Sequence, residues 1–292
     1  VVLKCKVKDM EEGWALIFSM SHAMADGHTY YTIMNQLNSS VPITKMNPVR
    51  KMNFESGEPT RIAKKDWAWA NSLSMIKHVL GGVMFGKQKG SVDGVPCYAY
   101  YVDPNKIQAE KAKAVASSRG KVEFVSTNDL VTSHFATAAD SGCLMMTINF
   151  RDRKEDFVKT DAGNYEGCFF LDKTNYTPAA IRQILGQDLP YTRPNNTTLP
   201  GFFESCNCSF ISSWVQSQPF DIKNLGAHQL LHVPLIPMPY SLAKPWMDVA
   251  IVFRPQPDKL AVFYNAKNFD RQGLFKEDSV LGNTVDVGIF GP

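Results

Sequence analysis

The stretch Ser21-His22-Ala23-Met24-Ala25-Asp26-Gly27 decides the fold of this chain. It stands where an apolar strand predicted over 14–20 gives way to a turn, directly before a helix predicted from about Thr29 to Asn38. A histidine at a strand end can direct its ring into a cleft, where a near-neutral pKa suits general base chemistry. Histidines at such positions are more often structural than catalytic, so from residue types alone both interpretations of His22 stay open.

Asp26 and Gly27 are expected to support the turn around His22. Asp26 can hold the turn rigid, provided that a cation reaches its carboxylate. Gly27 gives the backbone freedom to turn sharply into the following helix. Both residues are therefore predicted to position the site rather than to react.

Strands and helices alternate on either side of this stretch. Residues 1–8 alternate between apolar and lysine side chains, which predicts a half-buried strand that pairs with 14–20 in a hairpin. Downstream, the patterns predict helices over 103–118 and from 126 onward, and strands over 97–102, 122–125, 144–149, 169–171, 209–214, 249–253 and 260–264. The alternation lacks strict βαβ regularity, so the predicted fold class is α/β with mixed sheets.

Residues 64–89 have a different texture, with lysines at both ends of a stretch that contains Trp67 and Trp69. Their polar members exclude a helix that spans a bilayer. Two interpretations stay open: a linker helix packed on its own domain, which is favoured, or an amphipathic helix that contacts a membrane surface or a protein partner.

The composition limits the class of protein. The 292 residues are 44% hydrophobic and 20% charged, which is typical of one large or two medium globular domains and excludes intrinsic disorder. With 31 Lys and Arg residues against 28 Asp and Glu, the net charge of +3 is too small and too evenly spread to indicate a nucleic-acid partner. No uninterrupted apolar run reaches the ~18 residues that a membrane span needs.

The six cysteines follow no CxxC spacing, so we expect buried thiols and no metal site; they are Cys5, Cys97, Cys143, Cys168, Cys206 and Cys208. The chain opens on Val1, already inside a predicted strand. We therefore expect that the start of the protein is missing together with any targeting segment, which leaves the localisation unknown. The chain is rich in Asn, Ser and Thr, so its Asn-x-Ser/Thr sites are weak evidence for secretion. A cytoplasmic or organellar location is favoured.

The stretch around His22 resembles the HxxxDG signature of the CoA-dependent acyltransferase superfamily, which includes chloramphenicol acetyltransferase, the plant BAHD acyltransferases and the condensation domains of peptide synthetases. Four further segments follow in the order of the BAHD branch and carry the resemblance over nearly the whole chain. Residues 126–132 resemble the segment that opens the helix after the crossover, and Asn149-Phe150-Arg151-Asp152-Arg153 resembles the strand that ends in Arg-x-Arg. Gly163-Asn164 resembles the Gly-Asn step, and Ser212-Ser213-Trp214 resembles the Thr-Ser-Trp strand.

This resemblance implies a chloramphenicol acetyltransferase-like fold. Such a fold has two subdomains with mixed β-sheets flanked by helices, and its active site lies at their interface. We expect residues 1–50 to be the remainder of the N-terminal subdomain, 51–90 a crossover linker with an amphipathic helix, and 91–292 the C-terminal subdomain.

The resemblance also implies direct acyl transfer without an acyl-enzyme. His22 takes the proton from a hydroxyl or amine of a small-molecule acceptor as that group attacks the thioester of acyl-CoA, a co-substrate rather than a permanently bound cofactor. By position, Ser212 is the expected donor to the oxyanion, and Trp214 is expected to shape the substrate pocket. Asp26 is a structural residue in this family that pairs with an arginine, and both Arg151 and Arg153 are candidates for that partner.

One stretch departs from the BAHD pattern. Residues 219–226 stand where that branch carries DFGWG, and they keep an Asp and a Gly without the Phe-Gly-Trp core. We therefore expect a divergent lineage of the superfamily that acts as an acyl-CoA-dependent O- or N-acyltransferase. The alternative is a member that has lost catalysis and serves as a scaffold or as a subunit of a larger assembly. A third hypothesis is a condensation domain, which would normally carry a second histidine where Ser21 stands.

Overall fold

The computed structural model describes residues 2–5, 15–38, 40–54, 61–78, 97–154, 156–194, 197–215, 232–234, 247–265 and 280–285. By its internal contacts the chain forms two compact units, each assembled from segments that are distant in sequence. Unit 1 takes its described residues from Val1–Gly57 and Asn149–Gly167. Unit 2 takes them from Glu58–Ile148, Cys168–Val215 and Leu230–Pro292.

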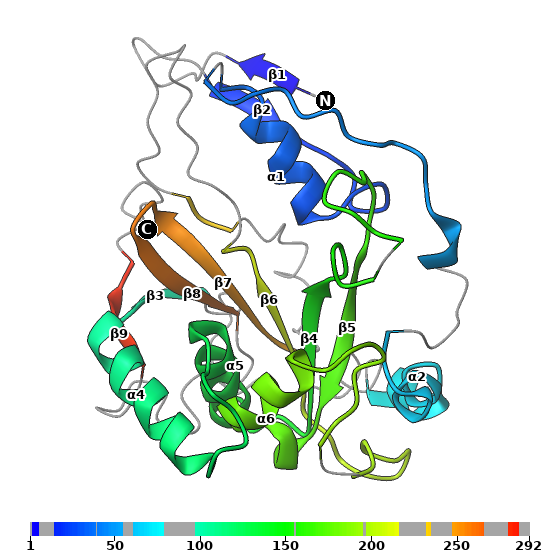
Figure 1. Cartoon of the computed structure of the whole chain (residues 1–292), viewed down its shortest axis with the longest axis vertical. Coiled ribbons are helices and arrows are strands. Elements are labelled where there is room, and N and C mark those ends of the chain that lie inside the picture. The colour runs from blue at the N-terminus through cyan, green and yellow to red at the C-terminus, as the bar shows by residue number, and fades with distance from the viewer. Residues whose placement is uncertain are drawn as a thin grey trace, which may run out of the picture. The chain divides into compact units, whose positions relative to one another are not determined.

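Unit 1 begins with the two predicted strands and the helix that follows the His22 stretch, drawn in blue in Figure 1. Strands β1 (Val2–Cys5) and β2 (Ala15–Phe18) pair antiparallel, as predicted. Helix α1 (Gly27–Asn35) begins two residues before the predicted Thr29, because Asp26 is its N-cap and accepts the Thr29 N–H at 3.0 Å. The cap therefore sets where the helix starts.

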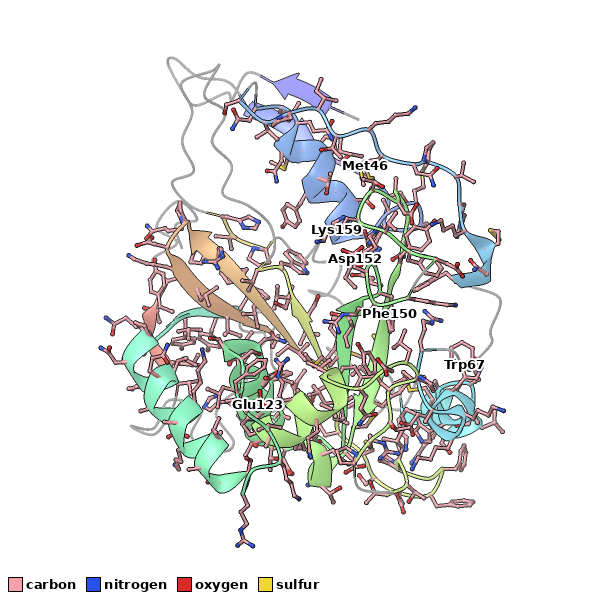
Figure 2. The ribbon with its side chains drawn as sticks, viewed as in Figure 1. Met46, Trp67, Glu123, Phe150, Asp152 and Lys159 are labelled. Carbon is pink, nitrogen blue, oxygen red and sulfur yellow. The ribbon has the colours of Figure 1, made fainter. Side chains whose placement is uncertain are left out.

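The core of unit 1 is aromatic. Phe54, in the short 3-10 helix η1 (Met52–Phe54), lies with its ring centroid 5.2 Å from that of Phe157, 5.5 Å from Tyr165 and 6.0 Å from Phe150. All four side chains are buried, and Phe150 is labelled in Figure 2. Contacts of this tilted and edge-on kind contribute about 0.5–1.5 kcal/mol per pair beyond the burial of the rings. They fasten the 149–165 loop to the chain that follows α1.

Unit 2 is built on a mixed sheet of seven strands in the order β5-β4-β6-β7-β8-β3-β9. The three strands in the order β4-β6-β7 run parallel, whereas β7-β8, β8-β3 and β3-β9 are antiparallel pairs. This confirms the predicted fold class. The strands are β3 (Cys97–Val102), β4 (Cys143–Asn149), β5 (Glu166–Leu171), β6 (Cys208–Ser213), β7 (Asp248–Gln256), β8 (Lys259–Asn265) and β9 (Leu281–Thr284).

Three helices lie beside one another in unit 2, and the middle one packs on the sheet (Figure 1). Helix α4 (Pro104–Ser117) is capped by Asp103, and α5 (Thr127–Ala138) starts with a capping box between Ser126 and Asp129, as these residues predict. Helix α5 contacts strands β6 and β7 and both neighbouring helices. The third helix, α6 (Pro178–Leu185), is joined to α5 because Arg182 donates to both carboxylate oxygens of Asp129, at 2.8 and 2.9 Å.

The predicted strand over 122–125 is wrong. This stretch connects α4 to α5 without taking part in a ladder of the described sheet, and Glu123 in it is labelled in Figure 2. Only Val125 of the four is buried, whereas Phe124 is 58% exposed. The apolar residues of this short connection have the pattern of a strand, but no strand of the described sheet pairs with them.

The described part of the 64–89 stretch belongs to unit 2 and packs on the rest of it. Helix α2 (Lys64–Ala70) carries Trp67, labelled in Figure 2, and Asn71 is its C-cap; residues 79–89 lie outside the described residues. Trp69 donates its indole N–H to the Pro200 carbonyl at 2.8 Å. These contacts support the linker interpretation. Within the described residues, no helix combines the length and the apolar character that crossing a membrane requires.

A buried ion pair also anchors α2 to the rest of unit 2. Arg193 donates to the two carboxylate oxygens of Asp66 on α2, at 2.8 and 3.2 Å, and to the carboxylate of Asp172, which follows β5. It donates to the Thr197 carbonyl at 2.9 Å as well. Because the arginine and both acids are buried, the hydrogen bonds among them replace those that water would make to each charge.

We expect Arg193→Ala to lower the free energy of unfolding by about 3–5 kcal/mol, because it leaves two buried carboxylates without their cation. Urea denaturation followed by circular dichroism measures the change. The matched control is Lys113→Ala, which removes an exposed ion pair to Glu110 and should cost about 0.5 kcal/mol or less. Equal midpoints for the two variants would contradict the anchoring role of Arg193.

Candidate active site

Asp26, four residues after His22, forms a buried ion pair with Arg151. The Arg151 Nη1 lies 2.7 Å from Asp26 Oδ2, and Nη2 lies 3.2 Å from Oδ1. The same two oxygens accept backbone N–H groups from Thr29, at 3.0 Å, and from Tyr165, at 2.8 Å. Of the two candidate arginines, Arg151 is thus the one paired with Asp26, whereas Arg153 is exposed.

All five N–H groups of the Arg151 guanidinium have acceptors. Besides Asp26, it donates to the Asp161 carbonyl at 2.9 Å and to the Asn149 side chain at 3.1 Å. Its Nη2 also reaches the Thr29 hydroxyl and the Gly163 carbonyl, at 3.0 and 3.1 Å. A buried charge is tolerated only when its hydrogen bonds are made in this way. Arg151 therefore ties the start of α1 to both ends of the 149–165 loop.

The ion pair fixes the charge of Asp26. Burial alone would raise the pKa of its carboxyl, but the hydrogen bond and the positive charge of Arg151, with the Thr29 and Tyr165 N–H groups, hold that pKa below its ordinary value. Asp26 is consequently ionised at neutral pH.

His22 is exposed beside this buried pair. Its side chain is 71% exposed, and its Nε2 lies 3.2 Å from Oε1 of Glu166, whose own side chain is 28% exposed. The His22 carbonyl accepts the Asn164 side-chain N–H at 3.2 Å. Both contacts come from the short stretch that ends the 149–165 loop and begins β5, so the ring and the backbone of His22 are held by the same piece of chain.

Glu166 is a residue that the sequence analysis missed. Burial and the negative charge of Asp26 raise the pKa of its carboxyl, and the nearby His22 and Arg151 oppose that rise. No local spacing signals its contact with a histidine so distant in sequence. The only hint is that it follows the Gly163-Asn164 step by two residues.

The role expected of Gly27 is not required by its backbone. Gly27 is the first residue of α1, and its φ lies outside the left-handed region that favours glycine. A Cβ built at Gly27 would meet no atom within 4 Å. The cap by Asp26, rather than a special glycine conformation, turns the chain into the helix.

Ser212 and Trp214 belong to unit 2, whereas His22 and its partners belong to unit 1. Ser212 is buried on β6, and its Oγ accepts the Trp214 indole N–H at 3.2 Å. The Trp214 backbone N–H donates to the Val252 carbonyl on β7 at 2.8 Å, so both the backbone and the ring of Trp214 are hydrogen-bonded. Residues 219–226 lie outside the described residues. In the part of the chain that is described, no three His, Cys, Asp or Glu residues are grouped to hold a metal.

Comparison with known proteins identifies the fold. No family model matches the chain, and no curated protein does. A crystal structure of F. graminearum TRI101 complexed with coenzyme A and T-2 mycotoxin is similar, with 14% identity and a TM-score of 0.52 over 82% of this chain and 59% of that one. Vinorine synthase is similar at 14% identity and a TM-score of 0.50, over 84% of this chain and 57% of that one. The chain thus spans less than two thirds of either protein, and the likeness shows the acyltransferase fold alone.

We expect Asp26→Ala to lower the free energy of unfolding by about 3–5 kcal/mol, because Arg151 is left as a buried cation without its carboxylate. Gly27→Ala is the neighbouring control and should be neutral or stabilising by up to ~1 kcal/mol. Thermal unfolding of both variants measures the difference. Equal melting temperatures for Asp26→Ala and wild type would contradict the supporting role of Asp26.

The contribution of Asp26 to the free energy of unfolding should also depend on pH. Because its folded-state pKa is lowered, the contribution is present above the ordinary Asp pKa of ~3.9 and is lost as the pH falls through the lower folded-state value. The free energies of unfolding of wild type and Asp26→Ala should therefore differ most near neutral pH and become equal in strong acid.

Proposed function

We propose that this protein transfers an acyl group from acyl-CoA to a hydroxyl or amine of a small-molecule acceptor. The observation that carries the proposal is an exposed imidazole, His22, held beside a buried and fully bonded ion pair. The fold supports it, because TRI101, which has this fold, was crystallised with coenzyme A. The HxxxDG-like stretch supports it from the sequence.

In the proposed reaction His22 is the general base. It takes the proton from the acceptor as the acceptor oxygen or nitrogen attacks the thioester carbonyl. The tetrahedral intermediate then collapses, the C–S bond breaks, and the proton on His22 passes to the departing thiolate of coenzyme A. A new ester or amide and free coenzyme A are the products, and no cysteine nucleophile is needed.

Ser212 suits the role of oxyanion donor. An indole N–H can only donate, so in its contact with Trp214 the Ser212 hydroxyl is the acceptor and keeps its own O–H. Trp214 in turn packs against a buried cluster that includes Ile251 and Phe253, which restricts the rotation of the serine beside it. A donor oriented before the reaction stabilises developing negative charge better than a mobile one.

We expect His22→Ala to abolish acyl transfer in the full-length protein without changing its melting temperature, because an exposed side chain is removed. Release of free thiol from a panel of acyl-CoAs, with hydroxyl and amine acceptors, measures the rate. His28→Ala is the control, since its ring contacts only the Lys159 carbonyl in the described residues and should leave the rate unchanged. Wild-type turnover in His22→Ala would refute the proposed base. Absence of turnover with every donor would favour the scaffold alternative.

We expect Ser212→Ala to lower kcat by about 10²–10³-fold, the usual effect of removing one oxyanion donor. KM for acyl-CoA should change little, because the bond forms to the intermediate. Ser213→Ala, at the next position of β6, is exposed and serves as the control. Equal kcat values for the two variants would remove Ser212 from the mechanism.

A further inference from the structure

We propose that Cys206 and Cys208 form a reversible oxidation site, at which a peroxide converts the two thiols into one disulfide. Both cysteines belong to unit 2, where Cys208 is the first residue of β6, and both are free thiols in the structure. Their Sγ atoms lie 3.8 Å apart. The proposed acyl transfer uses neither cysteine, so this inference does not depend on the proposed function.

The chain between the two cysteines is held in place. The Asn207 carbonyl accepts the Gly142 N–H at 2.8 Å, and the Asn207 side-chain amide donates to the Ala139 carbonyl at 2.6 Å. The same amide donates to Oδ2 of Asp248, the first residue of β7, at 3.1 Å. The sulfur of Cys206 also lies close to Gly142, where an added Cβ would come within 2.9 Å of it. The two sulfurs are therefore kept as neighbours, and side-chain rotation has only to bring them to the ~2.05 Å of a disulfide bond.

The neighbouring thiols differ in their access to solvent. Cys206 is half-buried, whereas Cys208 is buried, and so is Cys143, which pairs with Cys208 in the register of β4 and β6. A dissolved oxidant therefore reaches Cys206 first. An accessible thiol beside a second cysteine is typical of reversible oxidation, because the second thiol traps the first oxidised form as a disulfide.

The contact also supplies a thiolate, which is the reactive form of cysteine. Hydrogen bonds from Cys143 and Cys206 lower the pKa of the Cys208 thiol, although burial opposes them. The hydrogen bond to Cys208 and burial raise the pKa of Cys206, and Lys77 opposes this rise. Cys206 and Cys208 therefore share one proton and one negative charge. Transfer of that proton between the two sulfurs places the charge on Cys206, the thiol that an oxidant can reach.

The proposed oxidation takes two steps. The Cys206 thiolate attacks one oxygen of hydrogen peroxide, the O–O bond breaks, and the departing hydroxide takes up a proton to become water. Cys206 is then a sulfenic acid, and the Cys208 sulfur attacks the Cys206 sulfur as the S–O bond breaks and a second water leaves with the Cys208 proton. The two thiols have lost two electrons, which the peroxide has gained. A thiol reductant reverses the reaction through a mixed disulfide.

Peptide mass spectrometry of the full-length protein, treated with hydrogen peroxide and then alkylated with N-ethylmaleimide, tests the proposal. We expect the peptide that carries both cysteines to lose two hydrogen atoms and both alkylation sites, and dithiothreitol to restore them. Cys206→Ser should lose this product completely. Cys168→Ser, which removes another half-buried free thiol, is the matched control and should oxidise as wild type does. If Cys206 and Cys208 are both still alkylated after a treatment that oxidises free glutathione, the proposal fails, and a disulfide between Cys208 and Cys143 would also overturn it.

Dimedone, which labels sulfenic acids, tests the roles of the two thiols. We expect the label on Cys206 in Cys208→Ser, because the attacked thiol remains and the thiol that traps it is gone. Cys206→Ser should carry no label on Cys208, because that sulfur is buried. The reverse pattern would overturn the assignment of Cys206 as the attacked residue. The mass measurement on wild type needs no substitution, so it decides the proposal even where a variant is unstable.

Discussion

The buried pair of Asp26 and Arg151 is the interaction on which unit 1 depends. One carboxylate caps α1, receives the start of β5 through Tyr165 and neutralises the arginine of the 149–165 loop. Removing charges from water is costly, and here the cost is offset because every donor and both oxygens are bonded. The arrangement is therefore all-or-none: helix start, loop and strand end are held together or not at all.

The proposed chemistry contrasts with this frame. His22 needs exposure to reach a substrate, and exposed side chains are easily displaced, so its precision has to come from neighbours. Asn164 and Glu166 contact His22 from a stretch that the ion pair already fixes. In unit 2, Ser212 is hydrogen-bonded by the indole of Trp214, whose backbone N–H is bonded to β7. In the proposed mechanism, stability and reactivity are thus assigned to different side chains.

Local signals predicted most of the fold, and non-local pairing limited the rest. Caps such as Asp103 and Ser126 correctly predicted where helices begin, because a capping pattern involves only about four neighbouring residues. The strand predicted over 122–125 was wrong, because the apolar pattern of a segment does not show whether a partner strand lies beside it. The short helix α6 was not predicted, because its eight residues are too few to show a clear helical period. In the site, Arg151 is buried against Asp26 whereas Arg153 is exposed, and Glu166 meets His22 through tertiary folding, so neither contact could be predicted from spacing.

The chain supplies Asp26 and its arginine 125 positions apart. A ribosome therefore completes the histidine segment long before the cation that neutralises it exists. Until synthesis passes residue 151, the nascent segment carries an acid that cannot be sequestered, and it stays open to chaperones and proteases. Any product that ends before residue 151 lacks this cation, and its Asp26 has no such partner to neutralise it.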